Sequence, residues 1–268
     1  MIIAEIGWNF LGDFSLAKKM IKKAKESGVN CVKFQLWDPS RLLPGPWDHD
    51  GRRELYEKSY LDLKKFKKIY NYCKKLNIEA FASVFNIESL QLLKKISRKY
   101  IKIPSVEAYN KSLILEALKN FKYVFVSTGA LTDKEFKKLF FFKKFKNFIP
   151  LHCVTSYPLD LKNANFEKFF ILKKNFSKVG YSGHYSGIDD ALYAISHGAS
   201  VVEKHFTVNK NLPGRDNKFA LLPEDIKLLV NYDNNNKLMK VTRSTSKTKG
   251  VLNCEKDVYF NYRGRWGV

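Results

Sequence analysis

Two histidines, His184 and His205, have the type and spacing to hold a metal ion together. Each lies at or just past the end of a short apolar run of β-strand character, and the residues between the two runs have helical apolar spacing. Such a strand–helix–strand unit would bring both imidazoles to the same edge of the fold. Two neutral imidazoles, with the polar residues Ser182, Glu203 and Asp216 nearby, suit a divalent transition metal. The alternative is structural, with His184 capping a turn and His205 half buried in its strand.

Three lysines lie inside apolar runs, where lysine is almost never buried without a partner. They are Lys33, Lys102 and Lys204. Because Lys33 and Lys102 lie near the ends of their runs, they are candidates for binding an anion. Strand alternation does not settle which side chains face inward, but Lys204, next to His205, is expected to face outward.

Hydroxyl and carboxyl groups follow the same runs. Ammonium groups, hydroxyls and backbone N–H groups are what a small phosphorylated anion requires, and two lysines would also serve a carboxylate on the same molecule. A single strand serine is usually only a hydrogen-bonded core hydroxyl, so the set as a whole carries the argument. Besides the residues already named, the set contains Glu5, Gln35, Ser83, Ser105, Glu107, Ser127, Thr155 and Tyr157.

The elements that must position these groups are eight apolar runs that alternate with helical patterns. Near-continuous apolar character fits parallel strands that are buried on both faces. Eight such units predict an α/β fold, a (β/α)₈ TIM barrel, in which the strand carboxyl ends form one active face. No Gly-rich dinucleotide fingerprint follows any strand, which disfavours an open doubly wound sheet. The runs are residues 2–7, 31–36, 79–84, 100–105, 123–128, 148–153, 178–183 and 201–206.

Two segments fall outside this alternation. Residues 37–61 are rich in proline and glycine and are predicted to form a long loop, a candidate lid over the active face. The residues from 237 onward are rich in Ser, Thr and Lys and then in aromatic side chains. We therefore predict a barrel domain over residues 1–236, followed by a linker and a short C-terminal tail over residues 237–268.

The chain carries a formal charge of +22, so nucleic acid is the first partner to consider. However, the lysines occur mainly as doublets within amphipathic segments, which makes a solvated helix surface the simpler interpretation and nucleic acid a poor candidate. Four cysteines without CxxC or disulfide-like spacing indicate a reducing compartment. The early Glu5 disfavours a signal peptide, and no apolar run approaches the ~20 residues of a membrane span. We expect a cytoplasmic protein without a membrane segment.

Eight short motifs occur in order along the chain, and together they resemble the N-acetylneuraminate (sialic acid) synthase family. They are IIAEIGWN, VKFQ, KIPSVEAYN, VSTGA, LHCVTSYP, GYSGH, GASVVEKHFT and GRD. Each motif is weak alone, but eight at barrel-strand spacing over about residues 2–230 are a specific signal. The resemblance is to the catalytic barrel alone, without the C-terminal antifreeze-like domain of family members.

This resemblance implies a metal-dependent enzyme that condenses phosphoenolpyruvate with an N-acetylated amino-hexose, such as N-acetylmannosamine. The product would be a nine-carbon 2-keto-3-deoxy sugar acid, with release of phosphate and use of Mn²⁺ or Mg²⁺. The metal ligands implied by matching position are His184 and His205. The implied phosphate contacts are Lys33, Ser127, Thr155 and Ser182.

The other implied contacts divide between the carboxylate of phosphoenolpyruvate, the sugar and the reacting centre. The carboxylate would meet Lys102, Ser83 and Ser105. The sugar would meet Gln35, Tyr157 and Asp216. The reacting centre would hold Glu5 and Glu107, and a carboxylate at Glu107 would equally serve to orient Lys102.

Several positions depart from the family pattern. An Asn-His-Asn-Gly run reads Asn9-Phe10-Leu11-Gly12, the usual Asp before the first metal histidine is Gly183, and Arg215 stands where Pro is expected. These departures leave open a non-catalytic or altered-specificity barrel that binds a sugar or a partner. A related phosphoenolpyruvate aldolase for a shorter or phosphorylated sugar is a further alternative. The resemblance also leaves open a homodimer.

Overall fold

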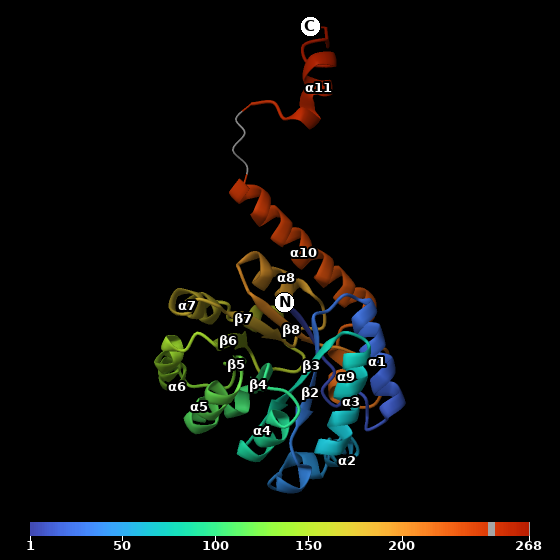
Figure 1. The fold of residues 1–268 in the computed structure, drawn as a ribbon, viewed down its shortest axis with the longest axis vertical. Coiled ribbons are helices and arrows are strands. Elements are labelled where there is room, and N and C mark those ends of the chain that lie inside the picture. The colour runs from blue at the N-terminus through green and yellow to red at the C-terminus, as the bar shows by residue number, and fades with distance from the viewer. Residues whose placement is uncertain (246–249, 268) are drawn as a thin grey trace. The chain divides into compact units, whose positions relative to one another are not determined.

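The computed structural model describes residues 1–245 and 250–267, and it contains a closed barrel of parallel strands (Figure 1). Each strand pairs with the next along the chain, and β8 closes the barrel by pairing with β1. The predicted (β/α)₈ TIM barrel is therefore confirmed. The strands are β1 (Ile2–Glu5), β2 (Cys31–Leu36), β3 (Glu79–Val84), β4 (Tyr100–Ile103), β5 (Tyr123–Ser127), β6 (Phe148–Cys153), β7 (Gly180–Gly183) and β8 (Val201–His205).

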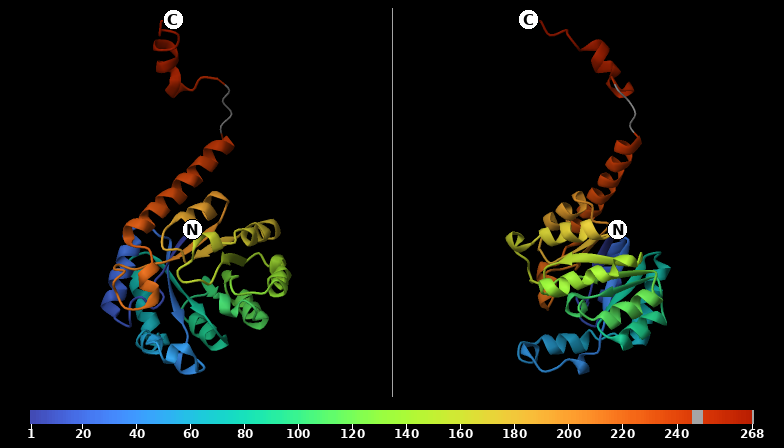
Figure 2. Two further views of the ribbon diagram at one scale, coloured as in Figure 1. Left: turned by 180° about the vertical axis from the view of Figure 1, so that it is seen from behind. Right: turned by 90° about the vertical axis from the view of Figure 1, so that its left-hand side faces the viewer.

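Helices connect consecutive strands and surround the barrel, as both views in Figure 2 show. Their starts follow from local capping: Asp13 accepts hydrogen bonds from two backbone N–H groups of the first helix, and Asn110 accepts one from Leu113. The α-helices of the barrel unit are α1 (Phe14–Glu26), α2 (Arg52–Lys58), α3 (Leu63–Lys75), α4 (Ile87–Lys94), α5 (Lys111–Asn120), α6 (Asp133–Lys138), α7 (Glu167–Asn175), α8 (Asp189–Ser196) and α9 (Arg215–Phe219).

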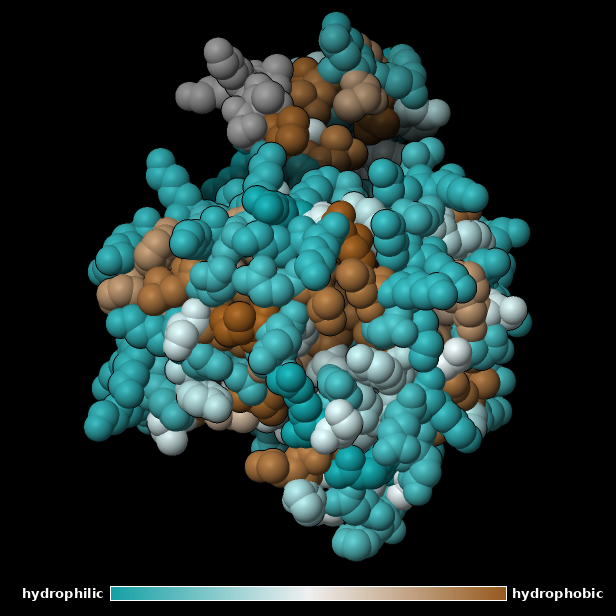
Figure 3. Space-filling view, turned by 60° about the horizontal axis from the view of Figure 1, so that its bottom comes forward, coloured by the Kyte–Doolittle hydropathy of each residue, from teal (hydrophilic) through white to brown (hydrophobic). Residues whose placement is uncertain are grey.

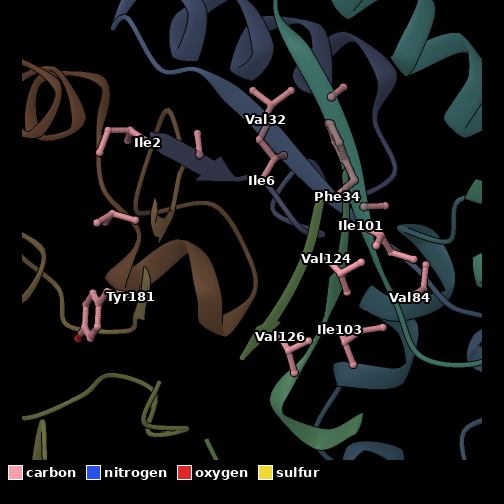
Figure 4. Packing of buried hydrophobic residues seen from close by; sticks show 14 of the residues in the cluster. Ile2, Ile6, Val32, Phe34, Val84, Ile101, Ile103, Val124, Val126 and Tyr181 are labelled. Atoms are coloured by element: carbon pink, nitrogen blue, oxygen red, sulfur yellow. The ribbon is translucent and has the colours of Figure 1, made fainter. Parts of the chain in front are cut away.

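Alternation along the strands produces two separate apolar clusters. The larger cluster lies between the strands and the helices, and Figure 4 shows part of it, including Val32, Ile103 and Val124. The smaller cluster fills the barrel interior at the amino-terminal ends of the strands. Its buried members are Ile3, Cys31, Phe81, Phe125, Ile149, Leu151 and Val201. The interior positions beyond this cluster are left for polar residues.

Residues 37–61 differ from the predicted long loop. They contain two 3₁₀ helices, η1 (Pro39–Arg41) and η2 (Pro46–Asp48), and most of the segment after Gly51 is helix α2. Gly51 has a left-handed backbone conformation with φ of 78°, which lets the chain turn into α2. The proline and glycine content that indicated a loop therefore marks the ends of short helices.

The chain divides into two compact units, Met1–Asp233 and Asn234–Val268. Helix α10 (Pro223–Thr245) includes residues 237–245, so the first part of the predicted linker is helical. Residues 246–249 and 268 of the predicted linker and tail lie outside the described residues. The second unit also contains η6 (Asn253–Glu255) and α11 (Lys256–Asn261). The domain assignment itself remains a prediction.

Hydrophilic side chains cover most of the molecular face in Figure 3, with smaller apolar patches between them. Several lysines lie over aromatic rings on the surface, such as Lys111, whose Nζ is 4.1 Å from the Phe141 ring centroid. Among the described residues, no helix is long and apolar enough to cross a membrane.

Candidate active site

A cavity of about 200 Å³ lies at the carboxyl ends of the barrel strands. It collects every predicted site residue except Glu107. The predicted residues that line it are Glu5, Lys33, Gln35, Ser83, Lys102, Ser105, Ser127, Thr155, Tyr157, Ser182, His184, His205 and Asp216. Residues that lie far apart in the sequence thus share one cavity, while the role of each remains a prediction.

The innermost part of the cavity is a network of two lysines and two carboxylates. The Lys33 Nζ lies 2.7 Å from Glu5 Oε2 and 3.6 Å from Glu203 Oε1, and it donates a 2.6 Å hydrogen bond to the Ser83 hydroxyl. The Lys102 Nζ lies 2.8 Å from the same Glu203 oxygen. Each lysine is only 2% exposed, so the carboxylates supply the partners that a buried ammonium group needs.

The pKa values of the two carboxylates in this network are shifted in opposite directions. Burial raises the pKa of Glu5 to about 7, although the neighbouring Lys33 opposes this shift. Burial also favours the neutral form of Glu203, but the Lys102 and Lys33 ammonium groups outweigh it and lower the pKa of Glu203. Glu203 is therefore the fixed negative charge, and Glu5 is the group able to gain or lose a proton near neutral pH.

The two imidazoles lie at one side of the cavity with ring centroids 5.5 Å apart. The His184 Nδ1 is 2.8 Å from the Val154 carbonyl oxygen, which fixes this nitrogen as the donor and leaves Nε2 free to accept. Burial lowers the pKa of both histidines to about 3, so both are neutral at physiological pH. The Nδ1 of His205 is buried and has no hydrogen-bond partner among the described residues.

These imidazoles meet the requirements of a divalent transition metal in part. Both are neutral, one is oriented by a backbone carbonyl, and the other has an unpaired ring nitrogen, which is the pattern of metal-ligating histidines. In the described part of the chain, no three His, Cys, Asp or Glu side chains are grouped as a complete ligand set. The residues therefore fit a two-histidine site that leaves positions open for water and substrate.

The outer wall of the cavity is aromatic. The Tyr157 and His184 ring centroids are 4.1 Å apart. The Arg215 guanidinium lies over the Tyr157 ring, 4.3 Å from the centroid of that ring. The Trp8 indole N–H donates a 2.9 Å hydrogen bond to Asp216 Oδ2, and the Arg215 Nε donates to the other Asp216 oxygen at 3.3 Å. Asp216 is thus held between two donors at the cavity wall.

The model of the NeuB family matches residues 20–244. The chain belongs to the NeuB family. It is 35% identical to N,N'-diacetyllegionaminic acid synthase of Campylobacter jejuni, over 85% of this chain and 74% of that protein. It is 32% identical to N-acetylneuraminate-9-phosphate synthase of Drosophila melanogaster, over 96% of this chain and 73% of that protein.

A solved structure agrees with these relatives. The N-acetylneuraminic acid (sialic acid) synthetase of Leptospira borgpetersenii, crystallised in complex with citrate, superposes with a TM-score of 0.81 at 30% identity. The superposition covers 99% of this chain and 92% of that one. The resemblance drawn from the eight motifs is therefore confirmed, as is the barrel of this NeuB family chain.

Glu107 is the predicted site residue that the structure does not place in the cavity. It ends the short 3₁₀ helix η3 (Ser105–Glu107), in which Ser105 and Val106 line the cavity instead. The Glu107 carboxylate accepts a 3.2 Å hydrogen bond from the Asn110 amide, and the residue is partly exposed. A 3₁₀ turn directs successive side chains about 120° apart, which explains why Glu107 points away from its neighbours.

The cavity is also lined by Trp8, Phe85, Pro104, Val106, Cys153 and Arg215, which were given no role from the sequence, and by Glu203, which was expected only as a polar group near the histidines. A signal for Glu203 exists, since the two-residue period of β8 places it on the same face as His205. Trp8 lies in a turn and Arg215 is the first residue of the short helix α9, and neither segment is long enough for a periodicity that indicates direction. Lys204 faces away from the cavity, as expected, and forms a buried ion pair with Asp190.

Proposed function

We propose that this NeuB family chain is an enzyme that condenses phosphoenolpyruvate with an acetamido sugar. The product is a nine-carbon 2-keto-3-deoxy sugar acid, and phosphate is released. The observation that carries the proposal is the joint placement of Lys33, Lys102, strand-end hydroxyls and two neutral imidazoles in one cavity. The names of the relatives describe the synthesis of legionaminic acid and of N-acetylneuraminate 9-phosphate, which supports a synthase over a non-catalytic barrel.

The inner network is suited to bind phosphoenolpyruvate. Its two ammonium groups are already positioned and desolvated in the cavity, where they can pair with an anion that replaces the resident carboxylates. Lys33 with Ser127, Thr155 and Ser182 would hold the phosphate, and Lys102 with Ser83 and Ser105 would hold the carboxylate. This division between the two lysines remains part of the proposal.

The aromatic wall is suited to bind the acceptor sugar. The Tyr157 ring and the Trp8 indole contribute apolar surface to the lining, while Asp216 and Gln35 offer polar groups that hydroxyls of a sugar can pair with. Because Trp8 and Arg215 hold both Asp216 oxygens, the carboxylate is fixed in direction before the sugar arrives. The acceptor would therefore lie between this wall and the imidazoles.

The reaction joins carbon 3 of phosphoenolpyruvate to the aldehyde carbon of the open-chain sugar. A divalent ion such as Mn²⁺ or Mg²⁺, held by His184 and His205, would polarise the aldehyde oxygen. Bond formation leaves positive charge at carbon 2 and turns the aldehyde oxygen into an alkoxide. Water adds at carbon 2, and the proton that it loses is passed on to the alkoxide, which becomes a hydroxyl group of the product. The tetrahedral carbon then expels phosphate, the hydroxyl proton at carbon 2 leaves with the phosphate, and the remaining oxygen becomes the keto group.

Glu5 is the residue that we assign to proton transfer in this sequence. It lies in the cavity, and its pKa is raised toward neutrality, so its carboxylate can accept a proton from the attacking water. The neighbouring Gln35 amide donates a 3.0 Å hydrogen bond to Glu5 Oε1 and fixes the carboxyl group in place. Glu107, outside the cavity, is the weaker candidate for this role.

Phosphate release from phosphoenolpyruvate tests the proposal, with Mn²⁺ and a panel of acetamido-hexoses. Sugar-dependent release that is lost in His184→Gln and kept in the surface variant Lys162→Met would support it. If phosphoenolpyruvate binds without any release, the chain is a barrel that kept its anion site without the chemistry. Arabinose 5-phosphate in the same panel distinguishes an aldolase for shorter, phosphorylated sugars. A cytoplasmic location and a homodimer remain predictions.

A further inference from the structure

A buried ion pair lies behind the imidazoles, outside the cavity, and has no part in the proposed chemistry. Lys204 of β8 and Asp190 of α8 are each only 1% exposed. The Lys204 Nζ donates to both Asp190 oxygens, at 2.9 Å and 2.8 Å, and the Tyr181 hydroxyl donates to Asp190 Oδ2 at 2.9 Å. A buried pair of charges is seldom retained for stability alone, because apolar residues of similar volume often serve as well.

The same ammonium group connects the two segments that carry the histidines. It donates a third hydrogen bond, 2.8 Å long, to the carbonyl oxygen of Tyr185, the residue after His184. Lys204 is itself the residue before His205, and its backbone is the register partner of Gly183, the residue before His184. One lysine therefore fixes the backbone on both sides of His184 relative to the strand that holds His205.

We propose that Lys204 and Asp190 are positioning residues that set the spacing of His184 and His205. The proposal rests on the proposed function in one respect, namely that the two imidazoles act together. Asp190 takes up two of the three ammonium hydrogens and so directs the third at the Tyr185 carbonyl. Without Asp190, a buried ammonium group would seek other partners, and the loop after β7 would lose its tether.

The space at Gly183 supports this assignment. A Cβ atom on residue 183 would overlap the Asp190 carboxylate and the Tyr181 ring, so only glycine leaves room for Asp190 to reach Lys204. Residue 183 is also opposite Lys204 in the β7–β8 register, on the same face.

Two measurements distinguish a positioning role of Lys204 and Asp190 from a role in stability alone. The first is the ring ¹H–¹⁵N spectrum of histidine-labelled protein, with His184 and His205 assigned by His184→Gln and His205→Gln. The second is calorimetric titration with Mn²⁺ alone. The main variant is Lys204→Met with Asp190→Leu, which replaces the pair by apolar side chains, and Asp190→Asn is a second variant that keeps the side-chain shape. The control removes Lys99 and Glu79, an ion pair at the amino ends of β4 and β3.

We expect the main variant to unfold within a few degrees of the wild type, to shift both ring signals, and to bind Mn²⁺ about 10–100-fold more weakly. The control should leave both readouts unchanged.

Folded variants with unchanged ring signals and Mn²⁺ affinity would overturn the positioning role. If wild-type protein binds no Mn²⁺, the metal part of the proposed function fails, and the ring spectra alone decide whether Lys204 and Asp190 position the histidines.

Discussion

The interior of this barrel changes from apolar to polar within two residues on the same face of the same strands. At the amino ends, aromatic and aliphatic side chains form a closed layer, with the Phe81 and Phe125 ring centroids 5.7 Å apart. At the carboxyl ends, lysines and carboxylates form the floor of the cavity. The pairs that span the change are Ile3 and Glu5, Phe81 and Ser83, Phe125 and Ser127, and Val201 and Glu203.

The difference between these layers separates stability from function. The lower layer is held by packing, which only a side chain of similar shape can replace. The upper layer is held by ion pairs and hydrogen bonds, which a charged substrate can take over. The strands thus present one rigid layer that fixes the backbone and one exchangeable layer that carries the chemistry.

A charge placed in the lower layer should have the largest effect. Phe125→Glu would bury a carboxylate among Phe81, Tyr100 and Ile149 without a cation, at a cost of more than about 5 kcal/mol of unfolding free energy. Urea unfolding followed by circular dichroism measures this. Phe125→Leu, which keeps the layer apolar, is the matched control, and an unchanged midpoint for Phe125→Glu would refute the division of the barrel into two layers.

Removing a charge from the upper layer should affect catalysis more than stability. Lys102→Met keeps the side-chain volume but loses the ammonium group beside Glu203. We expect kcat/KM for phosphate release to fall about 1,000-fold, or about 4 kcal/mol, with a loss of no more than about 2 kcal/mol in unfolding free energy. Equal losses in both measurements would show that the lysine is structural.

The histidines should make the upper layer sensitive to acid. Burial holds the pKa of His184 near 3 in the folded protein, below its unfolded value, so the unfolded chain takes up a proton first as pH falls. Stability is therefore lost from about pH 6.5 downward, by roughly 2–3 kcal/mol per histidine at pH 4.5. Urea unfolding at pH 7 and pH 4.5 should show a smaller loss for His184→Gln. An identical loss would contradict the buried neutral imidazole.

The cavity wall should show the smallest effect. Trp8→Phe keeps an aromatic ring and removes the indole N–H that donates to Asp216. We expect a several-fold rise in KM for the sugar, about 1 kcal/mol, with the KM for phosphoenolpyruvate unchanged. Steady-state kinetics with each substrate varied in turn measures the two KM values separately. A change confined to the KM for phosphoenolpyruvate would show that the sugar does not bind at this wall of the cavity.

Sequence patterns predicted the strands well because each strand is a short apolar run between polar segments. They also identified most of the cavity, since parallel strands of a barrel end on one face and their last inward residues must meet there. Motif resemblance, rather than periodicity, assigned individual roles. The order of the lysines and histidines along the chain was enough to place them together.

The differences between the sequence-based expectations and the structure have physical causes. Glu107 lies outside the cavity because a one-turn 3₁₀ helix decides its direction, and no periodicity exists over three residues. Strand periodicity places Glu203 on the inner face of β8, but its ion-pair partners Lys33 and Lys102 lie too far away in the sequence for a local pattern to indicate them. Helix α2 was predicted as loop because the glycine and prolines that flank short helices are the same residues that build loops.

Lys33 and Lys102 are already paired with carboxylates, so an anion that binds in the cavity has to replace those carboxylates. An arriving anion must displace carboxylates that are tethered to the protein, and tethered groups compete at effective concentrations of about millimolar or more. A monovalent anion such as acetate cannot compensate both lysines at once, so we expect calorimetry to detect phosphoenolpyruvate binding under conditions where acetate does not bind. The resident carboxylates would then keep common cellular anions out of the cavity until a ligand with two separate negative groups arrives.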